Sequence, residues 1–391
     1  MRGNLMTLRY LTSGESHGPE LLGIIDGLPA GLDLTEDIIS RDLIRRQQGY
    51  GRGGRMKIES DAAKIVSGVR WGKTTGAPVG LVIQNRDWEN WKERMSASPS
   101  DSGKAEPVTR PRPGHADLAG MMKYGHEDAR NILERSSARE TAMRVAVGAA
   151  AKALLSQFGI SVLGWVVEIG GIRAELKGRP AALFKRAEAS AVRCPDEGAS
   201  RNMMEVIDRA RKDGDSLGGI FEVTVLGCPP GLGTYTSRDN TLDGALAQAL
   251  MSIQAIKGVE IGLGFGAARR PGSAVHDEIF HNRAKGYYRK TDNAGGIEGG
   301  MSNGEDIVLR AAMKPIPTLY KPLHSVDTTS HRAFKASVER SDTCAVPAAA
   351  VVGEAVAAFV IAQAMREKFG GDSLAEMKRN YDGYMDYIRN F

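Results

Sequence analysis

Two histidines in this sequence lie in short glycine- or proline-bounded segments that can bring an imidazole to a ligand. His17 lies between glycines in Gly14–Gly18 (GESHG), where the backbone around the imidazole is open. An imidazole that serves a ligand fits that segment, and so does a capped turn with a solvent-exposed histidine. His115 lies in Arg110–Asp117 (RPRPGHAD), where prolines fix the chain and a carboxylate follows two residues later. A nearby carboxylate orients an imidazole and favours its protonated form, so this segment predicts a proton donor.

A basic segment follows the first predicted helix. No carboxylate separates its five cations, which are Arg45, Arg46, Arg52, Arg55 and Lys57. Guanidinium groups match phosphate and carboxylate oxygens, so the segment predicts an anion site. The alternative is a flexible basic loop that touches nucleic acid. The net charge of +5 and the pI near 9.0 do not choose between nucleic acid, anionic lipid and a polyanionic small molecule.

A second predicted anion site is the start of a long apolar helix. Ser137 and Glu140 have the spacing of a capping box. Arg135 and Arg139 bracket this helix start, where free N–H groups and a partial positive charge attract anions. Ordinary capping explains the serine and the glutamate but not the two arginines.

The C-terminal third holds three further candidate segments. The stretch 295–304 has almost no side-chain bulk, so its backbone can approach a flat or anionic ligand, although a flexible loop fits as well. Lys314–Thr318 (KPIPT) is rigid and follows a predicted strand. Asp342 follows Arg340 shortly before Pro347, which lies in the first turn of the last predicted helix. By itself that pair indicates no more than a helix cap.

Several classes of protein are disfavoured. There is no GxGxxG after a strand and no GxxxxGK[ST] phosphate loop, and the remaining histidines lack metal-ligand spacing, so no metal is predicted. Three isolated cysteines and the lack of an apolar signal segment favour a cytoplasmic protein. The apolar run Ala345–Met365 is interrupted by Glu354 and Gln363, which favours a buried core helix over a membrane span.

The elements that must position these residues alternate along the chain. A strand is expected at Leu21–Ile25, and a helix at Leu34–Arg46 with Thr35 as its N-cap. The polar segment Asp87–Pro113 predicts a long surface loop or lid. Helices buried on most sides are expected at Ala138–Phe158, Leu242–Ile256 and Pro347–Met365. Strands are expected between them, at Val162–Ile169, Gly219–Leu226 and Ile307–Met313. The pattern predicts a layered α+β core, and no linker divides residues 1–391 into more than one domain.

Seven motifs then resemble the chorismate synthase family in type and in order. They are GESHG, RPGHAD, RSSARET, QAIKGVEIG (Gln254–Gly262), GG…GGMSNG, KPIPT and RSDTCAVP, and together they cover the chain from about Leu8 to Ile361. The sequence departs from the family pattern in two places. Met301 stands where many members have isoleucine, and the Asp87–Pro113 segment is longer than in compact members.

The resemblance implies both a fold and a reaction. The fold is a β-α-β sandwich, with long central helices between antiparallel sheets, assembled as a homotetramer. The activity is that of a carbon–oxygen lyase acting on phosphates. It removes phosphate from 5-enolpyruvylshikimate-3-phosphate (EPSP) by 1,4-anti elimination and gives chorismate, the last step of the shikimate pathway that feeds aromatic amino-acid biosynthesis. Reduced FMN is the expected cofactor, with no net redox change.

The resemblance also assigns residues. His17 is expected near the departing phosphate as proton donor, His115 near the N1/O2 edge of the flavin, and Asp342 near flavin N5. Arg46 and Arg52 match the family's NADP positions, and with the charge argument they are expected around EPSP together with Arg55, Arg112, Arg139 and Arg340. The FMN-binding set is Arg135, Ser136, Ser137, Gln254, Ala255, Gly299, Lys314, Pro315, Ile316, Pro317, Thr318 and Arg340.

Two rival functions compete with this assignment. An NADPH-dependent flavin reductase is the nearest enzyme, but no segment is dedicated to nicotinamide. NADPH is therefore a candidate reductant, and an external reductant or flavin reductase is expected. An RNA-binding protein using the Arg/Gly segment predicts an affinity that falls steeply with salt. Neither nucleic acid nor a membrane is the expected partner.

Overall fold

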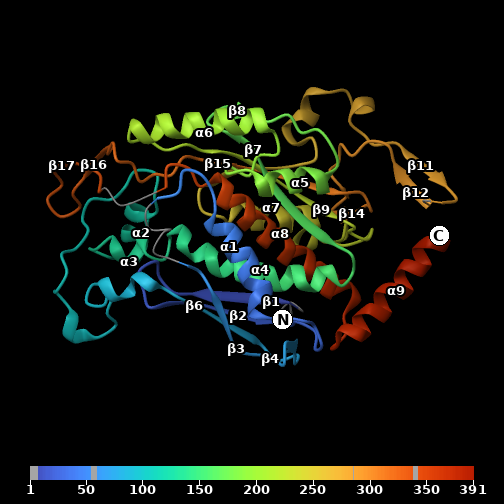
Figure 1. Ribbon diagram of the computed structural model, residues 1–391, viewed down its shortest axis with the longest axis horizontal. Helices are drawn as coiled ribbons and strands as arrows, with labels where there is room; N and C mark the ends of the chain where they lie inside the picture. Colours follow the sequence, from blue (N-terminus) through green and yellow to red (C-terminus); the bar gives the residue numbers. More distant parts are fainter. Residues whose placement is uncertain (1–7, 54–59, 285, 338–341) are drawn as a thin grey trace.

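The computed structural model describes residues 8–53, 60–284, 286–337 and 342–391. Its centre is formed by two long helices, α4 (Thr141–Ser156) and α8 (Val346–Phe369), which pack against each other. Two antiparallel sheets lie on opposite sides of this pair (Figure 1). The predicted sandwich of central helices between antiparallel sheets is confirmed.

The first sheet has the strand order β1-β2-β6-β3. Its strands are β1 (Arg9–Ser13), β2 (Glu20–Asp26), β6 (Val79–Gln84) and β3 (Ala63–Ser67). Alternation along β2 buries Leu21 and Ile25 on the side of α4 and exposes Leu22 and Ile24 on the other side. Helix α1 (Glu36–Gln47) packs on α4 and begins as predicted, with the Thr35 hydroxyl accepting from the Ile38 amide.

The second sheet has the order β10-β15-β9-β7-β8, and α8 covers one face of it. Its strands are β10 (Ile256–Ile261), β15 (Ile307–Met313), β9 (Gly219–Leu226), β7 (Ser161–Ile169) and β8 (Ile172–Arg173). On the other face Trp165 and Val167 pack against Leu183 and Ala187 of α5 (Pro180–Ala189). Helix α5 thus covers this outer face, and α6 (Glu197–Lys212) lies beside the edge strand β8 (Figure 1). The sequence pattern predicted neither helix.

The close contact between the central helices depends on a small residue. A Cβ at Gly148 of α4 would lie 2.7 Å from the Ala355 carbonyl oxygen of α8, so any larger side chain would push the helices apart. Helix α8 is long and apolar enough to cross a membrane, but 89% of its most apolar stretch is buried inside the protein. The prediction of a core helix for this segment is therefore confirmed.

The three predicted buried helices differ from the structure at their ends, and α8 continues past the predicted Met365 to Phe369. Helix α7 (Leu242–Met251) stops well before Ile256, which instead opens β10. Ala255 has φ +69°, a left-handed conformation that cannot continue a right-handed helix. Helix α7 also buries only one face. Helix α4 begins at Thr141 because the residues before it form a 3-10 turn, η4 (Ala138–Glu140).

The predicted surface loop at Asp87–Pro113 is largely exposed and contains two 3-10 turns, η2 (Arg86–Asn90) and η3 (Pro99–Asp101). The other helices are α2 (Asp117–Tyr124), α3 (Arg130–Leu133), α9 (Leu374–Asn390), η5 (Arg238–Asn240), η6 (Gly264–Arg269) and η7 (Gly272–Ala274). Short hairpins join β4 (Val69–Arg70) to β5 (Lys73–Thr74), β11 (Ile279–Asn282) to β12 (Gly286–Arg289), β13 (Ile297–Glu298) to β14 (Met301–Ser302), and β16 (His324–Val326) to β17 (Ala333–Lys335).

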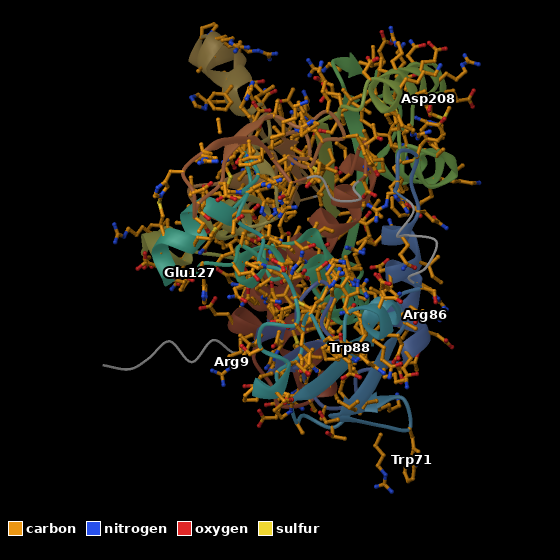
Figure 2. The ribbon with its side chains drawn as sticks, turned by 90° about the vertical axis from the view of Figure 1, so that its left-hand side faces the viewer. Arg9, Trp71, Arg86, Trp88, Glu127 and Asp208 are labelled. Atoms are coloured by element: carbon orange, nitrogen blue, oxygen red, sulfur yellow. The ribbon has the colours of Figure 1, made fainter. Side chains whose placement is uncertain are left out.

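One hairpin places a tryptophan in solvent. Trp71 and Gly72 link β4 to β5 with φ +52° and +75°, the left-handed pair that a two-residue turn requires. The Trp71 side chain projects from the tip of this hairpin, away from the rest of the protein (Figure 2). Only the Arg70 guanidinium lies over its ring among the described residues, at 3.8 Å from the centroid.

Candidate active site

A cavity of about 960 Å³ opens beside the N-terminal ends of the central helices. This volume lies at the upper end of the range for small-molecule sites. Loops from distant parts of the chain form its walls together with the first turns of α8, which contribute Ala345, Ala348, Ala349 and Val352. Among the described residues that line it, six are cations and two are acids: Arg46, Arg52, Arg94, Arg112, Arg139 and Lys314, against Asp87 and Asp342. The cavity therefore suits a strongly negative ligand.

His17 lies in this cavity and is held by a buried carboxylate that sequence reasoning missed. Its Nδ1 lies 2.9 and 3.0 Å from the two carboxylate oxygens of Glu134, and its backbone amide donates to Glu134 Oε2 at 2.9 Å. Arg130 Nη1 donates to Glu134 Oε1 at 3.0 Å. Burial opposes ionisation of Glu134, but the contacts with His17 and Arg130 outweigh it and lower the pKa of the carboxyl group.

His115 lies in the same cavity beside Asp117, as the sequence predicted. Nδ1 of His115 lies 2.5 Å from Asp117 Oδ1, and Arg112 Nε donates to Asp117 Oδ2 at 2.9 Å. Arg112 also donates from Nη1 to Thr318 Oγ1 at 3.1 Å, which ties this segment to the predicted flavin segment. Burial opposes ionisation of Asp117, but the hydrogen bonds from His115 and Arg112 prevail and hold its pKa far below the ordinary value.

Two of the predicted anion-binding arginines share one carboxylate. Arg46 Nη1 lies 3.3 Å from Asp61 Oδ2, and Arg139 Nη1 contacts Asp61 Oδ1. Burial is the main cause that lowers the pKa of Arg46 to about 10, and the neighbouring cations Arg52 and Arg139 act in the same direction. A guanidinium with that pKa is still charged at neutral pH. Asp61 is a second buried acid that the motif pattern did not reveal.

Asp342 meets the basic segment rather than acting only as a helix cap. Arg52 Nη1 lies 2.9 Å from Asp342 Oδ2, and the Gly53 amide donates to Oδ1 at 2.6 Å. Both Arg52 and Asp342 line the cavity with the two histidines. The predicted residues Arg55 and Arg340 lie outside the described residues.

Most of the predicted flavin-binding residues line the cavity. These are Ser136, Ser137, Gln254, Ala255, Lys314, Ile316, Pro317 and Thr318. Arg135, Gly299 and Pro315 are not among the lining residues. Arg135 donates instead to the Thr12 and Gly14 carbonyls, and Gly299 is an exposed residue in the turn between β13 and β14.

The predicted capping box is wrong in its second half. Ser137 caps the 3-10 turn, because its hydroxyl accepts from the Arg139 amide at 3.3 Å. The Glu140 carboxylate does not accept from the Ser137 amide, as a capping box requires. It accepts from the Thr12 hydroxyl and pairs with Arg144, because the 3-10 turn points its side chain toward β1 and along α4.

The long polar segment forms part of the cavity wall, whereas the sequence predicted only a surface loop or lid there. Asp87, Asn90, Trp91 and Arg94 line it. Trp91 stacks on His17 with ring centroids 3.9 Å apart and an interplanar angle of 22°. Tryptophan at this position was visible in the sequence, but no motif linked it to the histidine.

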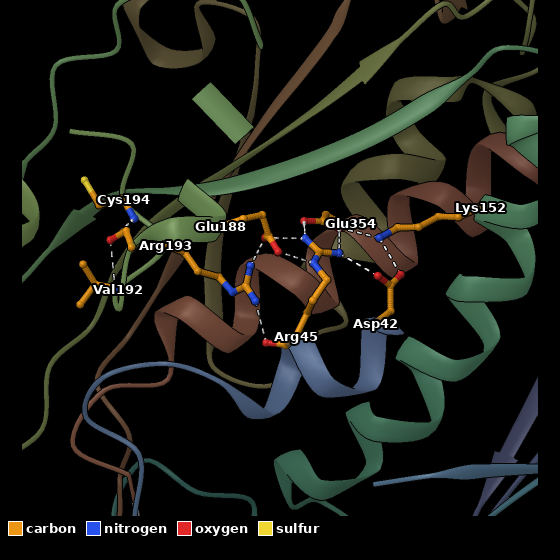
Figure 3. Close-up of polar contacts among 9 residues, drawn as sticks. Asp42, Arg45, Lys152, Glu188, Val192, Arg193, Cys194 and Glu354 are labelled. Carbon is orange, nitrogen blue, oxygen red and sulfur yellow. Dashed lines mark hydrogen bonds and ion pairs between the residues drawn. The ribbon is translucent and has the colours of Figure 1, made fainter. Parts of the chain in front are cut away.

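Arg45, although adjacent to Arg46, belongs to a different cluster. Its guanidinium contacts Asp42, Glu188 and Glu354, and Lys152 bridges Asp42 and Glu354 (Figure 3). With Arg193 on Glu188, the described residues of this cluster are three cations and three carboxylates. The expectation that Arg45 serves an external anion is therefore wrong, because carboxylates from α1, α5 and α8 already neutralise it.

Comparison with known proteins gives one consistent result. The family model described as chorismate synthase matches residues 8–366. Chorismate synthases of Pelobacter propionicus and Trichlorobacter lovleyi are 62% and 61% identical to this chain over 98% of its length, covering 99% and 100% of those proteins. A crystal structure of chorismate synthase, 45% identical, superposes with a TM-score of 0.80 over 98% of this chain and 99% of that one. The chain therefore belongs to the chorismate synthase family and is a lyase.

Proposed function

We propose that this protein converts EPSP to chorismate and inorganic phosphate by 1,4-anti elimination, the reaction of its family, as the last step of the shikimate pathway. The observation that carries the proposal is the cavity of about 960 Å³, in which arginines and two carboxylate-paired histidines face one space. EPSP has two carboxylates and a phosphate of about −1.5 to −2, so its total charge approaches about −4. Six lining cations suit that charge.

The cavity also has features that fit a flavin. Gln254 Oε1 is buried and no described residue donates to it, so it can accept from an N–H group of a ligand. Ala255 keeps a left-handed backbone at the cavity wall, a strained conformation of the kind found at binding sites. Lys314, Ile316, Pro317 and Thr318 would hold FMN from one side, and Ser136 and Ser137 from another. When bound, reduced FMN supplies an electron-rich ring that assists loss of an allylic phosphate.

The roles of the polar residues follow from their contacts. Arg46, Arg52, Arg112 and Arg139 bind the anionic groups of EPSP, together with Arg55 and Arg340 from the resemblance. His17 donates a proton to the departing phosphate. His115 is kept oriented by Asp117, and Asp342, held by Arg52, directs proton movement at the carbon that loses hydrogen. Arg135, Gly299 and Pro315 stay predictions that rest on the resemblance alone.

We propose that the chain is a cytoplasmic homotetramer built from one domain spanning residues 1–391. One buried apolar cluster extends from Leu8 to Met377, which supports a single domain. The outer face of the first sheet exposes Leu11, Ile24 and Val66, and an apolar sheet face of this kind suits contact with a second copy.

The test is an anaerobic assay of the purified chain with chemically reduced FMN and EPSP. The expected result is chorismate and phosphate in equal amounts. Absence of both products, with intact EPSP recovered, would refute the proposal. A parallel anaerobic reaction with EPSP and oxidised FMN, in which NADPH is the sole reductant, is expected to give no turnover, because electrons must come from another external reductant or a reducing partner. Turnover in that reaction would show that the chain reduces its own flavin.

A further inference from the structure

The carboxylate behind His17 defines which ring nitrogen of this histidine can act. Both oxygens of Glu134 lie within 3.0 Å of His17 Nδ1, and the same carboxylate accepts from the His17 amide. Glu134 is 2% exposed. Burial raises the pKa of its carboxyl group, but the contacts with His17 and Arg130 outweigh burial and lower that pKa below the ordinary value, so Glu134 is ionised at neutral pH. An ionised carboxylate can only accept, so Nδ1 must carry a proton. The nitrogen left for other chemistry is Nε2.

The surroundings of Nε2 are different. His17 lines the large cavity, and no described residue makes a hydrogen bond to its Nε2. The imidazole side chain retains 13% of its exposure, whereas the Glu134 side chain retains 1%. The ring therefore connects a buried anion on one side to the ligand space on the other.

A second, independent contact restricts the ring from its face. The indole of Trp91 lies 3.9 Å from the imidazole centroid and nearly parallel to it. Trp91 is itself fixed, because its Nε1 donates to Asp87 Oδ2 at 3.0 Å and the Arg130 guanidinium lies 5.1 Å from its ring centroid. Arg130 also binds Glu134, so the same cation supports both groups that hold the histidine.

We propose that Glu134 is a positioning residue for the elimination, acting through His17 with Trp91 as the clamp on the ring face. This inference rests on the proposed role of His17 as proton donor. In that step the Nε2–H bond breaks and an O–H bond forms on the departing phosphate. The neutral imidazole keeps its Nδ1 proton, which stays hydrogen-bonded to Glu134, and Glu134 remains a carboxylate throughout. The donor in this step is the doubly protonated ring, with one proton on Nε2 and one on Nδ1 that Glu134 accepts. Without Glu134 the ring can rotate and the imidazolium loses the adjacent anion that balances its charge, so Nε2 no longer presents a proton to the substrate.

The experiment is a double-mutant cycle in the full chain with chemically reduced FMN and EPSP. Glu134→Gln should lower kcat by about 10²-fold and leave KM for EPSP within about 2-fold, because the change affects orientation of a proton donor and not an anion contact. In the His17→Ala background the same substitution should have no further effect. A carboxylate with a purely structural role would instead lower the rate equally in both backgrounds, which would overturn the inference.

Further variants keep the inference testable if Glu134→Gln folds poorly. Trp91→Ala should lower kcat more than Trp91→Phe, which preserves a stacking ring, and both effects should vanish when His17 is alanine. Glu89→Gln is the control, since Glu89 lies in the same segment with 72% of its side chain exposed and should leave the rate unchanged. A readout that does not need activity is the ¹⁵N spectrum of histidine-labelled protein, in which the His17 signal, identified by its loss in His17→Ala, should report a protonated Nδ1. This signal should shift in Glu134→Ala, which removes the acceptor, and an unchanged signal would overturn the inference.

Failure of the inference can be told from failure of the proposed function. If the unmodified chain forms no chorismate, the proposed function is wrong. If the chain forms chorismate and His17→Ala is slow but Glu134→Gln is not, the function stands and the positioning role is refuted. Full activity of His17→Ala would refute the inference as well.

Discussion

Replacing Glu354 by glutamine is expected to destabilise the folded protein strongly, because this carboxylate is fully buried in the middle of α8 between two cations. Arg45 Nη2 lies 2.7 Å from Oε1, and Lys152 Nζ lies 2.5 Å from Oε2 (Figure 3). Gly164 of β7 makes room for this side chain, since a Cβ there would lie 2.8 Å from Glu354 Cγ. The amide has nearly the same volume, so the substitution changes charge and hydrogen bonding rather than packing.

The magnitude follows from the balance of charges in the cluster. Three carboxylates and three cations meet there, and the glutamine variant leaves one positive charge uncompensated. Its amide nitrogen also faces a cationic donor that it cannot bind. Removing one partner of a buried ion pair costs about 3–5 kcal/mol. For a chain of 391 residues, an unfolding entropy of about 2.1 cal/mol/K per residue converts this to a decrease in Tm of about 4–6 °C.

The assay is calorimetric unfolding of the two proteins at one concentration and pH, with an exposed ion pair as the control. Asp26→Asn removes the partner of Arg9, and both side chains of that pair are well exposed, so its cost should stay at or below about 1 kcal/mol. Adding Lys152→Met to Glu354→Gln removes the surplus charge and should recover part of the lost stability. A loss for Glu354→Gln no larger than that of Asp26→Asn would refute the reasoning.

Three further outcomes are expected. His115→Ala and Asp342→Ala should each lower kcat for chorismate formation by about 10²-fold in protein that still folds, and near-normal rates in both would contradict their assigned roles. Arg52→Ala should raise KM for EPSP and also lower kcat, because Arg52 holds Asp342 at 2.9 Å; a change in KM alone would show that this ion pair is irrelevant to the chemistry. Burial, followed by the nearby acids, raises the pKa of Asp292 to about 7. A raised pKa means that the folded state holds the proton more tightly, so stability is lost as pH rises from 3.8 toward 7. Asp292→Asn should therefore have a higher Tm than the parent at pH 8 and an equal one below pH 3.8, and equal values at both would exclude the effect.

The elements of the core could be predicted because their signals are local. Strands β9 and β15 have the predicted bounds, and α1 begins after the predicted cap residue, since apolar alternation and a capping hydroxyl are properties of neighbouring residues. The predicted end of α7 at Ile256 was wrong because Ala255 has a left-handed conformation that interrupts a right-handed helix, and alanine has no preference for that region that a sequence could reveal.

The residues that face the cavity could largely be predicted, but the carboxylates behind them could not. Motifs mark His17 and His115, and only Asp117 lies near enough in sequence to be recognised as a partner. Glu134 is 117 residues from His17 along the chain, and Asp61 is 78 residues from Arg139. An isolated acid has no sequence pattern of its own, so its role appears only when the fold brings it to its partner.

The same limit explains why a count of local charges predicted too much for Arg45. Five cations without an intervening acid require compensation, but the sequence does not tell whether a ligand or a distant carboxylate supplies it. For Arg45 the compensation is internal, since Glu354 lies 309 positions away and the cluster is neutral. For Arg46 one carboxylate, Asp61, is divided between two guanidinium groups, and the cavity that these groups line has more cations than acids. The ratio of cations to carboxylates in the folded site, and not the density of arginine in the sequence, is therefore what separates an anion-binding arginine from a structural one.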